Sequence, residues 1–306
     1  MYAIIGGNGF LGSYVIRAIL NKTDEIIIAT SRNLESMTEN KRIKWIKCDV
    51  QADQSVDTFL NILSAYKNIK LLYLAAYHHP DKVEENKTLA WDINVTCLSK
   101  FINKASFVSK IIYASTDNVY GESVNGYRFR EQDALKPVNF YGHNKCASEA
   151  VTIHLGRNVV RLPFLISPSI VEKPHFYDVI VENIKAGKTF EMFDDSYRSS
   201  LSFENAGRIL VDLFERGNIP SVVNVCGDEA LSKYDVGRMI AKREGLNPGL
   251  ILPISTEKSQ ENFRVKRAKN TLMDNVLLKE TLGLEYIDIF DEPTRARISS
   301  LSTTYV

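Results

Sequence analysis

The chain opens with Ala3-Ile4-Ile5-Gly6-Gly7-Asn8-Gly9-Phe10-Leu11-Gly12, in which an apolar run leads into a glycine-rich turn. A helical pattern follows over Phe10–Asn21. A glycine turn between a strand and a helix lets the backbone approach a pyrophosphate closely, and the N–H groups at the start of the helix then bind the anion. The opening of the chain therefore predicts a dinucleotide site within a strand–turn–helix unit.

The same alternation of strands and helices continues through the first 165 residues. Apolar runs rich in Ile, Val, Leu and Tyr predict strands at Ala3–Gly6, Glu25–Thr30, Ile43–Cys48, Leu71–Ala75, Lys110–Ser115 and Asn158–Phe164. Helix-length segments lie between them at Phe10–Asn21, Val56–Lys67, Glu84–Ala105 and Phe140–His154. This order predicts an α/β fold, a doubly wound parallel sheet with helices on both faces.

After residue 165 prolines separate shorter elements. We expect helices near Asp178–Ala186, Asn205–Arg216 and Lys233–Glu244, and a strand at Ser221–Val225. The sequence therefore predicts a nucleotide-binding domain over residues 1–165 and a smaller substrate-binding lobe over residues 166–306, partly interleaved with it.

The charge composition of the chain bears on the kind of partner that it binds. The 306 residues include 38 Lys and Arg against 37 Asp and Glu, so a net charge of +1 gives no electrostatic reason to expect nucleic acid or a membrane surface as the partner. No apolar run reaches the roughly 18 residues that span a bilayer, and the N-terminus lacks a signal-like segment. Because the 4 cysteines lie far apart, we expect a cytoplasmic protein with reduced thiols and no metal site.

The residues after the second predicted strand bear on the choice of cofactor. About 20 residues beyond the glycine turn, a carboxylate would bind the ribose 2′-hydroxyl of NAD. This chain has Ser31 and Arg32 there, which suit a 2′-phosphate. The sequence therefore favours NADP(H), with NAD(H) left open as the alternative. Asp49 and Val50 follow the third strand, where we expect the adenine.

A second group of polar residues follows the strand Lys110–Ser115, in the stretch Ser115-Thr116-Asp117-Asn118. The carboxyl ends of parallel strands are where doubly wound sheets bind ligands. In the helix Phe140–His154, Tyr141 and Lys145 stand one turn apart and share a face, so both side chains can point into one cleft.

In this order the motifs resemble the extended short-chain dehydrogenase/reductase family, also called the NAD-dependent epimerase/dehydratase family. They are Gly6-x-x-Gly9-x-x-Gly12, Asp49-Val50, Leu74-Ala75-Ala76, Asn94-Val95, Ser115-Thr116-x-x-Val119-Tyr120-Gly121, Tyr141-x-x-x-Lys145 and an Arg161 followed by Pro168. The resemblance implies a Rossmann-like fold whose cofactor-binding residues are Gly6, Asn8, Gly9, Phe10, Leu11, Gly12, Ser31, Arg32, Asp49, Val50, Ala75, Ala76, Tyr141 and Lys145.

The resemblance also implies catalytic roles. Tyr141 would be the general acid that protonates a carbonyl oxygen while hydride arrives from the cofactor. Lys145, together with the positive nicotinamide of the oxidised cofactor, would lower the pKa of that phenol from about 10, and it would also bond the nicotinamide ribose. Thr116 would donate a hydrogen bond to the substrate oxygen, and Asn94 would complete a water-linked proton path.

Most extended members act on nucleotide-activated sugars, which the family implies as the substrate class. The segment Tyr197-Arg198-Ser199 resembles the family's R-D-Y-x-x-V-x-D stretch, in which the arginine grips the diphosphate, a task that suits a guanidinium. Together with Arg198, the residues expected to contact substrate are Tyr77, His78, Ser115, Asp117, Asn118 and Phe164.

Three details distinguish the branches of the family. Dehydratases use an Asp-Glu pair where this chain has Asp117-Asn118, and epimerases carry Asn where it has Phe164. The stretch Leu74–Glu85 resembles the A-A-Y-x-x-V-D-x-A-E segment of dTDP-4-dehydrorhamnose reductases, and Lys269–Asn275 resembles their R-P-x-N-S-x-L-D segment. These similarities imply an oxidoreductase of polysaccharide biosynthesis that reduces the 4-keto group of a dTDP-4-dehydro-6-deoxyhexose with NADPH.

Two alternatives stay open: an NAD(P)-dependent nucleotide-sugar epimerase, and a non-catalytic NADP(H)-binding protein that regulates a partner. Homodimerisation through two helices of the α/β domain is common in the family.

Overall fold

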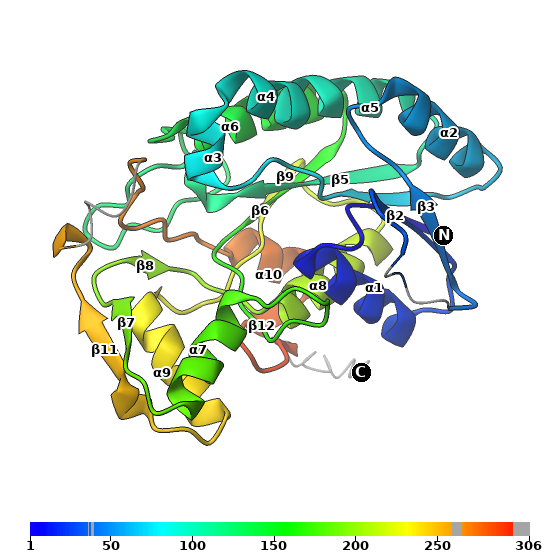
Figure 1. Ribbon diagram of the computed structural model, residues 1–306. Helices are drawn as coiled ribbons and strands as arrows, with labels where there is room; N and C mark the ends of the chain where they lie inside the picture. The colour runs from blue at the N-terminus through cyan, green and yellow to red at the C-terminus, as the bar shows by residue number, and fades with distance from the viewer. Residues whose placement is uncertain (36, 38–39, 259–264, 296–306) are drawn as a thin grey trace, which may run out of the picture.

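A seven-stranded sheet forms the centre of the protein (Figure 1). The computed structural model describes residues 1–35, 37, 40–258 and 265–295. Every neighbouring pair of strands in the sheet is parallel, which confirms the predicted doubly wound α/β fold. The strand order is β3 (Ile43–Lys47), β2 (Ile27–Ser31), β1 (Tyr2–Ile5), β4 (Lys70–Tyr73), β5 (Lys110–Thr116), β6 (Asn158–Leu162) and β9 (Val222–Asn224).

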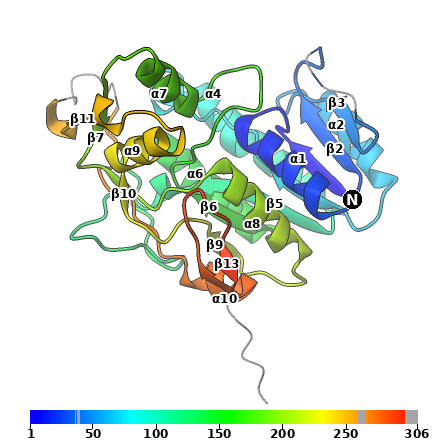
Figure 2. The ribbon, with the colours of Figure 1, turned by 90° about the horizontal axis from the view of Figure 1, so that it is seen from below.

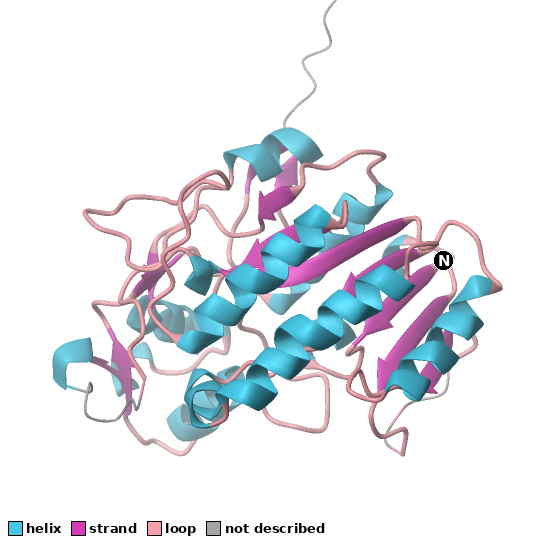
Figure 3. Cartoon of the chain, turned by 90° about the horizontal axis from the view of Figure 1, so that it is seen from above, coloured by secondary structure: helices cyan, strands magenta, loops and turns pink. Residues whose placement is uncertain are grey.

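Alternating side chains of the strands feed two separate cores. In β1, Tyr2 and Ile4 belong to one core and Ala3 and Ile5 to the other, because successive strand residues point to opposite faces. Helices α1 (Phe10–Lys22), α8 (Phe203–Glu215) and α10 (Val276–Leu282) pack against the first face. The second face is covered by α2 (Asp53–Ser64) and α5 (Leu98–Lys104). Helix α6 (Phe140–His154) lies on this side too, and Figure 3 shows the helices crossing the strands.

A smaller lobe stands at one end of the sheet and has its own apolar core, which includes Ile180, Met192 and Ile240. Within the described residues it contains two-stranded sheets, β7 with β11 in parallel and β8 with β10 antiparallel. Its elements are α7 (Phe176–Lys185), β7 (Phe190–Phe193), β8 (Tyr197–Arg198), β10 (Leu231–Ser232), α9 (Lys233–Arg243), the 3-10 turn η3 (Pro248–Leu250) and β11 (Ile251–Ile254). A further pair, β12 (Leu284–Tyr286) and β13 (Thr294–Arg295), follows α10.

The part of the chain after residue 165 is shared between the two lobes. Helix α8 lies beside α1 in Figures 1 and 2, and strand β9 completes the large sheet next to β6. The division of the chain at residue 165 therefore stays a prediction. None of the described helices is long and apolar enough to cross a membrane.

The single helix predicted over Glu84–Ala105 is wrong. The structure has α3 (Pro80–Glu85), α4 (Lys87–Trp91), the π-helix η1 (Asp92–Cys97) and α5 in its place. Asn86 Oδ1 accepts a hydrogen bond from the Leu89 backbone N–H at 3.1 Å and so starts α4 as a new helix. The apolar periodicity continues from α3 into α4, but the cap at Asn86 ends one helix and begins the next.

Candidate active site

The opening glycine turn brings the start of α1 against the end of β1. A Cβ atom at Gly12 would lie 2.5 Å from the Gly6 carbonyl oxygen, so no larger residue fits this close approach. Gly9 is the N-cap of α1 and has no side chain with which to bond the first turn. The N–H groups at the start of α1 are therefore free to bind an anion, and a dinucleotide pyrophosphate fits this cradle.

A cavity of about 340 Å³ adjoins the turn at the carboxyl ends of β1, β2 and β4. Its lining contains many of the predicted cofactor-binding residues, namely Gly6, Asn8, Gly9, Ser31, Arg32, Asp49, Val50, Ala75 and Ala76. Tyr77 and His78, predicted to contact substrate, line the same cavity. Phe10 turns away and packs its ring against His175, with 4.7 Å between ring centroids, while Leu11 packs against the core.

The end of this cavity next to β2 carries a cation. Arg32 lines it, and Asp49 is the acidic side chain among the described lining residues. The Ser31 hydroxyl accepts a hydrogen bond from the Asn33 N–H at 3.2 Å and donates to the Asn33 carbonyl, so it is held within the turn. A 2′-phosphate therefore fits Arg32 better than it fits the Ser31 hydroxyl.

A polar loop follows β5, and its hydroxyl and amide groups bond to one another. Thr116 Oγ1 donates to Asp117 Oδ1 at 3.0 Å and accepts from Asn118 Nδ2 at 2.9 Å. Both Thr116 and Asp117 are buried. Ser115 points the other way, because its hydroxyl donates to the buried Glu149 carboxylate. The structure thus does not support the predicted contact of the Ser115 hydroxyl with substrate.

Helix α6 approaches this loop closely enough to bring Tyr141 beside it. Asn139 caps the helix by accepting a hydrogen bond from the Gly142 N–H at 2.9 Å. A Cβ at Gly142 would lie 2.8 Å from the Asn118 carbonyl oxygen and 2.6 Å from Pro137 Cβ. Only glycine permits this contact between the helix and the loop.

Lys145 stands below Tyr141 on the same face of α6 and is 4% exposed. Its Nζ donates to Tyr113 Oη and to the Ala114 carbonyl, both at 2.9 Å, and lies 6.0 Å from the centroid of the Tyr141 ring. The ammonium is thus anchored on β5, and its remaining N–H is available to a ligand.

Burial is the largest cause of the pKa shifts of Tyr141 and Lys145. It raises the pKa of Tyr141 above its usual value, and the negative charge of Asp117 raises it further. Burial lowers the pKa of Lys145 to about 7, although Glu149 opposes the effect. The expected lowering of the phenol pKa by Lys145 together with an oxidised cofactor stays a prediction. In the protein without ligands the Tyr141 phenol keeps its proton, as a proton donor must before the reaction.

Asn94 lies in the π-helix η1, and both polar atoms of its side chain are bonded to the backbone of Tyr77. Its Oδ1 accepts from the Tyr77 N–H at 2.7 Å, and its Nδ2 donates to the Tyr77 carbonyl at 3.0 Å. The Asn94 carbonyl accepts from Ser148 Oγ at 2.8 Å. Asn94 therefore holds the loop after β4 against α6, and its predicted part in a proton path stays a prediction.

A buried ion pair fixes α6 to the sheet. Arg161 Nη2 on β6 lies 2.7 Å from Glu149 Oε2 on α6, and both side chains are almost fully buried. Arg161 Nη1 also donates to Tyr120 Oη at 2.7 Å, and Tyr120 donates to Asn224 Oδ1 on β9 at 2.8 Å. This network stabilises the position of the helix that carries Tyr141 and Lys145.

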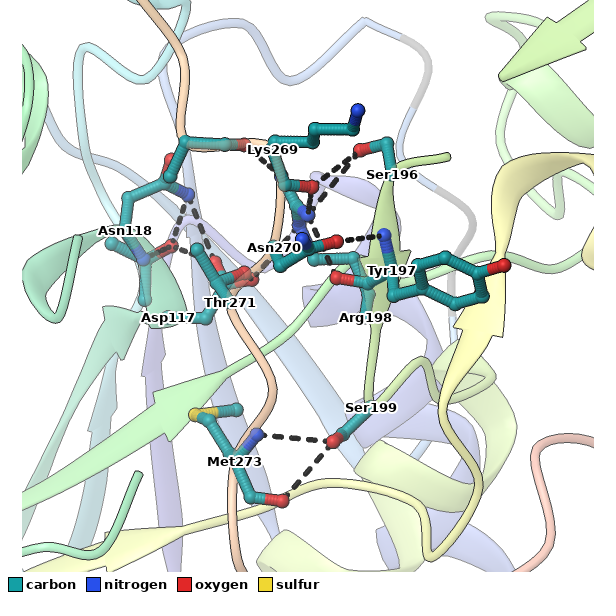
Figure 4. A network of polar contacts seen from close by, with 12 residues as sticks. Asp117, Asn118, Ser196, Tyr197, Arg198, Ser199, Lys269, Asn270, Thr271 and Met273 are labelled. Carbon is teal, nitrogen blue, oxygen red and sulfur yellow. Dashed lines mark hydrogen bonds and ion pairs between the residues drawn. The ribbon is translucent and has the colours of Figure 1, made fainter. Parts of the chain in front are cut away.

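Arg198 is bonded on nearly all sides by the protein itself (Figure 4). Its Nη1 donates to the Lys269 carbonyl at 2.6 Å, and its Nη2 donates to the Ala268 carbonyl at 2.8 Å. Its Nε lies 3.4 Å from Asp117 Oδ2, an oxygen that also accepts a hydrogen bond from Thr271. Arg198 therefore joins the segment after residue 267 to the loop after β5. Its predicted grip on a diphosphate competes with these bonds.

A second cavity, of about 420 Å³, lies on the other side of Arg198 and extends into the small lobe. Phe164, a predicted substrate residue, stacks against Lys233, which lines this cavity. Of the described lining of this cavity the sequence analysis predicted Arg198 as a site residue, and it missed Lys233. A lysine as the first residue of a helix is the signal that could have revealed it, because a cation is unfavourable at a helix N-terminus. Its described lining is Glu122, Phe193, Ser196, Arg198, Lys233, Thr256, Glu257, Val265, Lys266, Arg267, Ala268 and Lys269.

The described residues contain no cluster of His, Cys, Asp and Glu side chains that could hold a metal ion. Of the two neighbouring histidines, His78 lines the dinucleotide cavity and His79 Nδ1 lies 3.9 Å from Asp81.

The glycine turn, the parallel sheet and the Tyr141–Lys145 pair define an extended short-chain dehydrogenase/reductase fold. The chain matches the family model described as the RmlD substrate binding domain over residues 2–292, and it belongs to that family.

Individual relatives are distant. A dTDP-4-dehydrorhamnose reductase from Bacillus anthracis str. Ames, solved in complex with NADP, is 21% identical with a TM-score of 0.76, and the match covers 94% of each chain. A dTDP-glucose 4,6-dehydratase from Escherichia coli is 24% identical over 275 residues, which cover 78% of this chain and 75% of that protein. Methionine adenosyltransferase 2 subunit beta from Danio rerio is 23% identical over 288 residues, covering 92% and 84%.

Proposed function

We propose that the protein reduces the 4-keto group of a nucleotide-activated deoxysugar of the dTDP-4-dehydro-6-deoxyhexose type, with NADPH as the reductant. The observation that supports the proposal is the pair Tyr141 and Lys145 on one face of α6, with Lys145 Nζ 6.0 Å from the centroid of the Tyr141 ring. Helix α6 packs at Gly142 against the loop after β5 that holds Thr116. The similarity to a dTDP-4-dehydrorhamnose reductase supports the choice of substrate class.

The cofactor would occupy the cavity beside the glycine turn. The N-terminus of α1 would bind its pyrophosphate, and Arg32 would bind a 2′-phosphate. Solved structures of the same fold hold NAD as well as NADP, and Arg32 favours NADP(H) for this chain. When bound, the reduced nicotinamide supplies the hydride.

Tyr141 would donate the proton to the developing alkoxide oxygen of the sugar. Because burial keeps the phenol protonated, it is in the correct state to act as an acid. Thr116 Oγ1 now donates to Asp117 Oδ1, and a substrate carbonyl oxygen would replace that carboxylate as its acceptor. Lys145 would use its remaining N–H to orient the nicotinamide ribose, since β5 holds the ammonium from the other side.

Two features oppose a dehydratase, although one of the relatives is named as such. Dehydration in this family needs a carboxyl group in the place of Asn118, and an amide cannot exchange a proton. The Asn118 amide is moreover bonded to Thr116 and Asp117, at 2.9 Å each, and so keeps this loop in its conformation.

The second candidate is a non-catalytic protein that binds NADP(H) and regulates a partner. One relative is named as a subunit, methionine adenosyltransferase 2 subunit beta, and a subunit by its name has a partner. One assay separates the candidates. The protein is mixed with NADPH and a dTDP-4-keto-6-deoxyhexose, and the absorbance of the reduced nicotinamide is followed together with the sugar product. Stoichiometric loss of NADPH supports the reductase. A changed sugar at constant NADPH indicates an epimerase, and binding without turnover indicates the regulatory protein.

A further inference from the structure

Lys233 lines the cavity beyond Arg198 and has aromatic rings beside its ammonium. Lys233 is the first residue of α9, and its Nζ lies 5.5 Å from the centroid of the Phe164 ring and 5.6 Å from that of Phe193. Within the part of the chain that the structure describes, this ammonium donates no hydrogen bond and joins no ion pair. Contacts with aromatic faces attract a cation, but they do not replace the hydrogen bonds that water would offer.

The surroundings of Lys233 disfavour its charge. A positive side chain at a helix N-terminus opposes the helix dipole. Burial and the positive charges of Arg198 and Arg267 lower the pKa of Lys233 to about 8. Ser232 and Asp235 form a capping box at the same helix start. Because this box satisfies backbone N–H groups there, the N-terminus of α9 is stabilised without Lys233. A lysine at this position therefore does not stabilise the fold. Residues that break a local rule of stability in this way are expected at binding sites.

Three other cations of the cavity are already engaged, while Lys266 is exposed to solvent. Arg267 Nη2 lies 2.8 Å from Asp81 Oδ2, and Lys269 Nζ lies 2.8 Å from Asp195 Oδ2. The Arg198 guanidinium is bonded to backbone carbonyls and to Asp117, as Figure 4 shows. An anion entering the cavity would have to compete with these contacts to bind Arg198, Arg267 or Lys269, whereas it can bind Lys233 without displacing an ion-pair partner from the described part of the chain.

We infer that Lys233 binds the diphosphate of the nucleotide-activated substrate and that Arg198 is a positioning residue for the loop after β5. The inference rests on the proposed function for the identity of the ligand. Arg198 bonds Asp117, the neighbour of Thr116, on one side and lines the cavity on the other. A substrate whose sugar lies at Thr116 would extend past Arg198 toward Lys233. The rings of Phe164 and Phe193 lie beside the ammonium and lower the local polarity, which strengthens its attraction to phosphate.

The test is isothermal titration calorimetry with dTDP and with UDP, neither of which requires turnover. The variants are Lys233→Met, Lys233→Arg and, as the matched control, Lys242→Met, which changes an exposed lysine in the last turn of the same helix. We expect Lys233→Met to weaken diphosphate binding by about 10- to 100-fold, Lys233→Arg to retain most of it, and Lys242→Met to change it by less than about 2-fold. Thermal unfolding without ligand should show Lys233→Met to be at least as stable as the wild type, because it removes an unpaired charge.

In the titrations with dTDP and UDP, three outcomes would overturn the inference: unchanged affinity of Lys233→Met for both diphosphates, equal losses in Lys233→Met and Lys242→Met, and no binding of either diphosphate to the wild type. A parallel titration with UDP-glucuronic acid and UDP-glucose identifies the anion. If Lys233→Met weakens only the acidic sugar nucleotide, the lysine serves a sugar carboxylate and the inference is wrong. Turnover is measured separately. A wild type that binds dTDP through Lys233 but oxidises no NADPH supports the binding role and contradicts the proposed reductase.

Discussion

Lys145 Nζ lies 6.0 Å from the centroid of the Tyr141 ring and bonds Tyr113 and Ala114 instead of the phenol. The pair shares one face of α6, yet the ammonium is anchored on β5 and the phenol keeps its proton. The protein alone thus holds a protonated acid beside a cation that burial makes easy to deprotonate. This arrangement leads to several measurable consequences.

The first concerns stability and pH. The pKa of Lys145 is about 7 in the folded protein against 10.5 for an ordinary lysine. Between these values the unfolded chain binds a proton that the folded protein does not, so raising the pH through this window favours the folded state. We expect the free energy of unfolding of the wild type to rise between pH 7 and pH 10, relative to Lys145→Met, by more than about 1 kcal/mol. Urea unfolding of both proteins without ligand measures it, and parallel pH profiles would contradict the burial of a charged Lys145.

The second concerns the buried pair that holds α6. Glu149→Gln removes the charge that faces Arg161 and leaves a buried guanidinium unpaired. We expect a loss of about 3–5 kcal/mol in the free energy of unfolding. The control is Lys104→Met, which breaks the exposed pair with Asp57 and should leave the free energy of unfolding nearly unchanged. Urea unfolding again gives both values. Equal losses in the two variants would mean that Glu149 and Arg161 are not buried together.

The third concerns the choice of cofactor. Arg32→Ala removes the cation at the end of the dinucleotide cavity next to β2. We expect the dissociation constant of NADPH to rise by about 10-fold or more and that of NADH to change by less than about 2-fold. Fluorescence titration of the reduced nicotinamide measures both. Arg130→Ala, at an exposed position outside this cavity, is the control. Equal weakening of NADPH and NADH by Arg32→Ala would show that Arg32 does not recognise a 2′-phosphate.

Much of the nucleotide-binding half could be predicted from the sequence. Helix α6 has the predicted bounds Phe140–His154, and the predicted strands differ from the observed ones only at their ends. Continuous apolar runs and the glycine turn dictate these elements locally, because a strand buried on both faces has little choice of register. The helix over Glu84–Ala105 failed since a single side-chain bond, from Leu89 to Asn86, decides where it breaks.

The orientation of the site residues was harder to predict than their presence. Ser115 and Thr116 are adjacent, yet the Ser115 hydroxyl bonds Glu149 in the interior while Thr116 joins the polar loop. In Arg198 the residue type suggested a diphosphate ligand, but carbonyl groups from a segment far along the chain occupy the guanidinium. Such partners come together only through the tertiary fold, so no local pattern reports them. Lys233 carried a local signal, a cation at a helix N-terminus, but its aromatic neighbours Phe164 and Phe193 come from other parts of the chain.

The most direct test of the proposed chemistry is the turnover of Tyr141→Phe. The substitution removes only the phenol oxygen, so the site keeps its shape and loses its proton donor. With NADPH and a dTDP-4-keto-6-deoxyhexose, we expect kcat to fall by about 100- to 10,000-fold, while the dissociation constant of NADPH changes by less than about 2-fold. Tyr286→Phe, at an exposed tyrosine on β12, should leave both values unchanged. A Tyr141→Phe enzyme that retains most of the wild-type rate would show that another group delivers the proton.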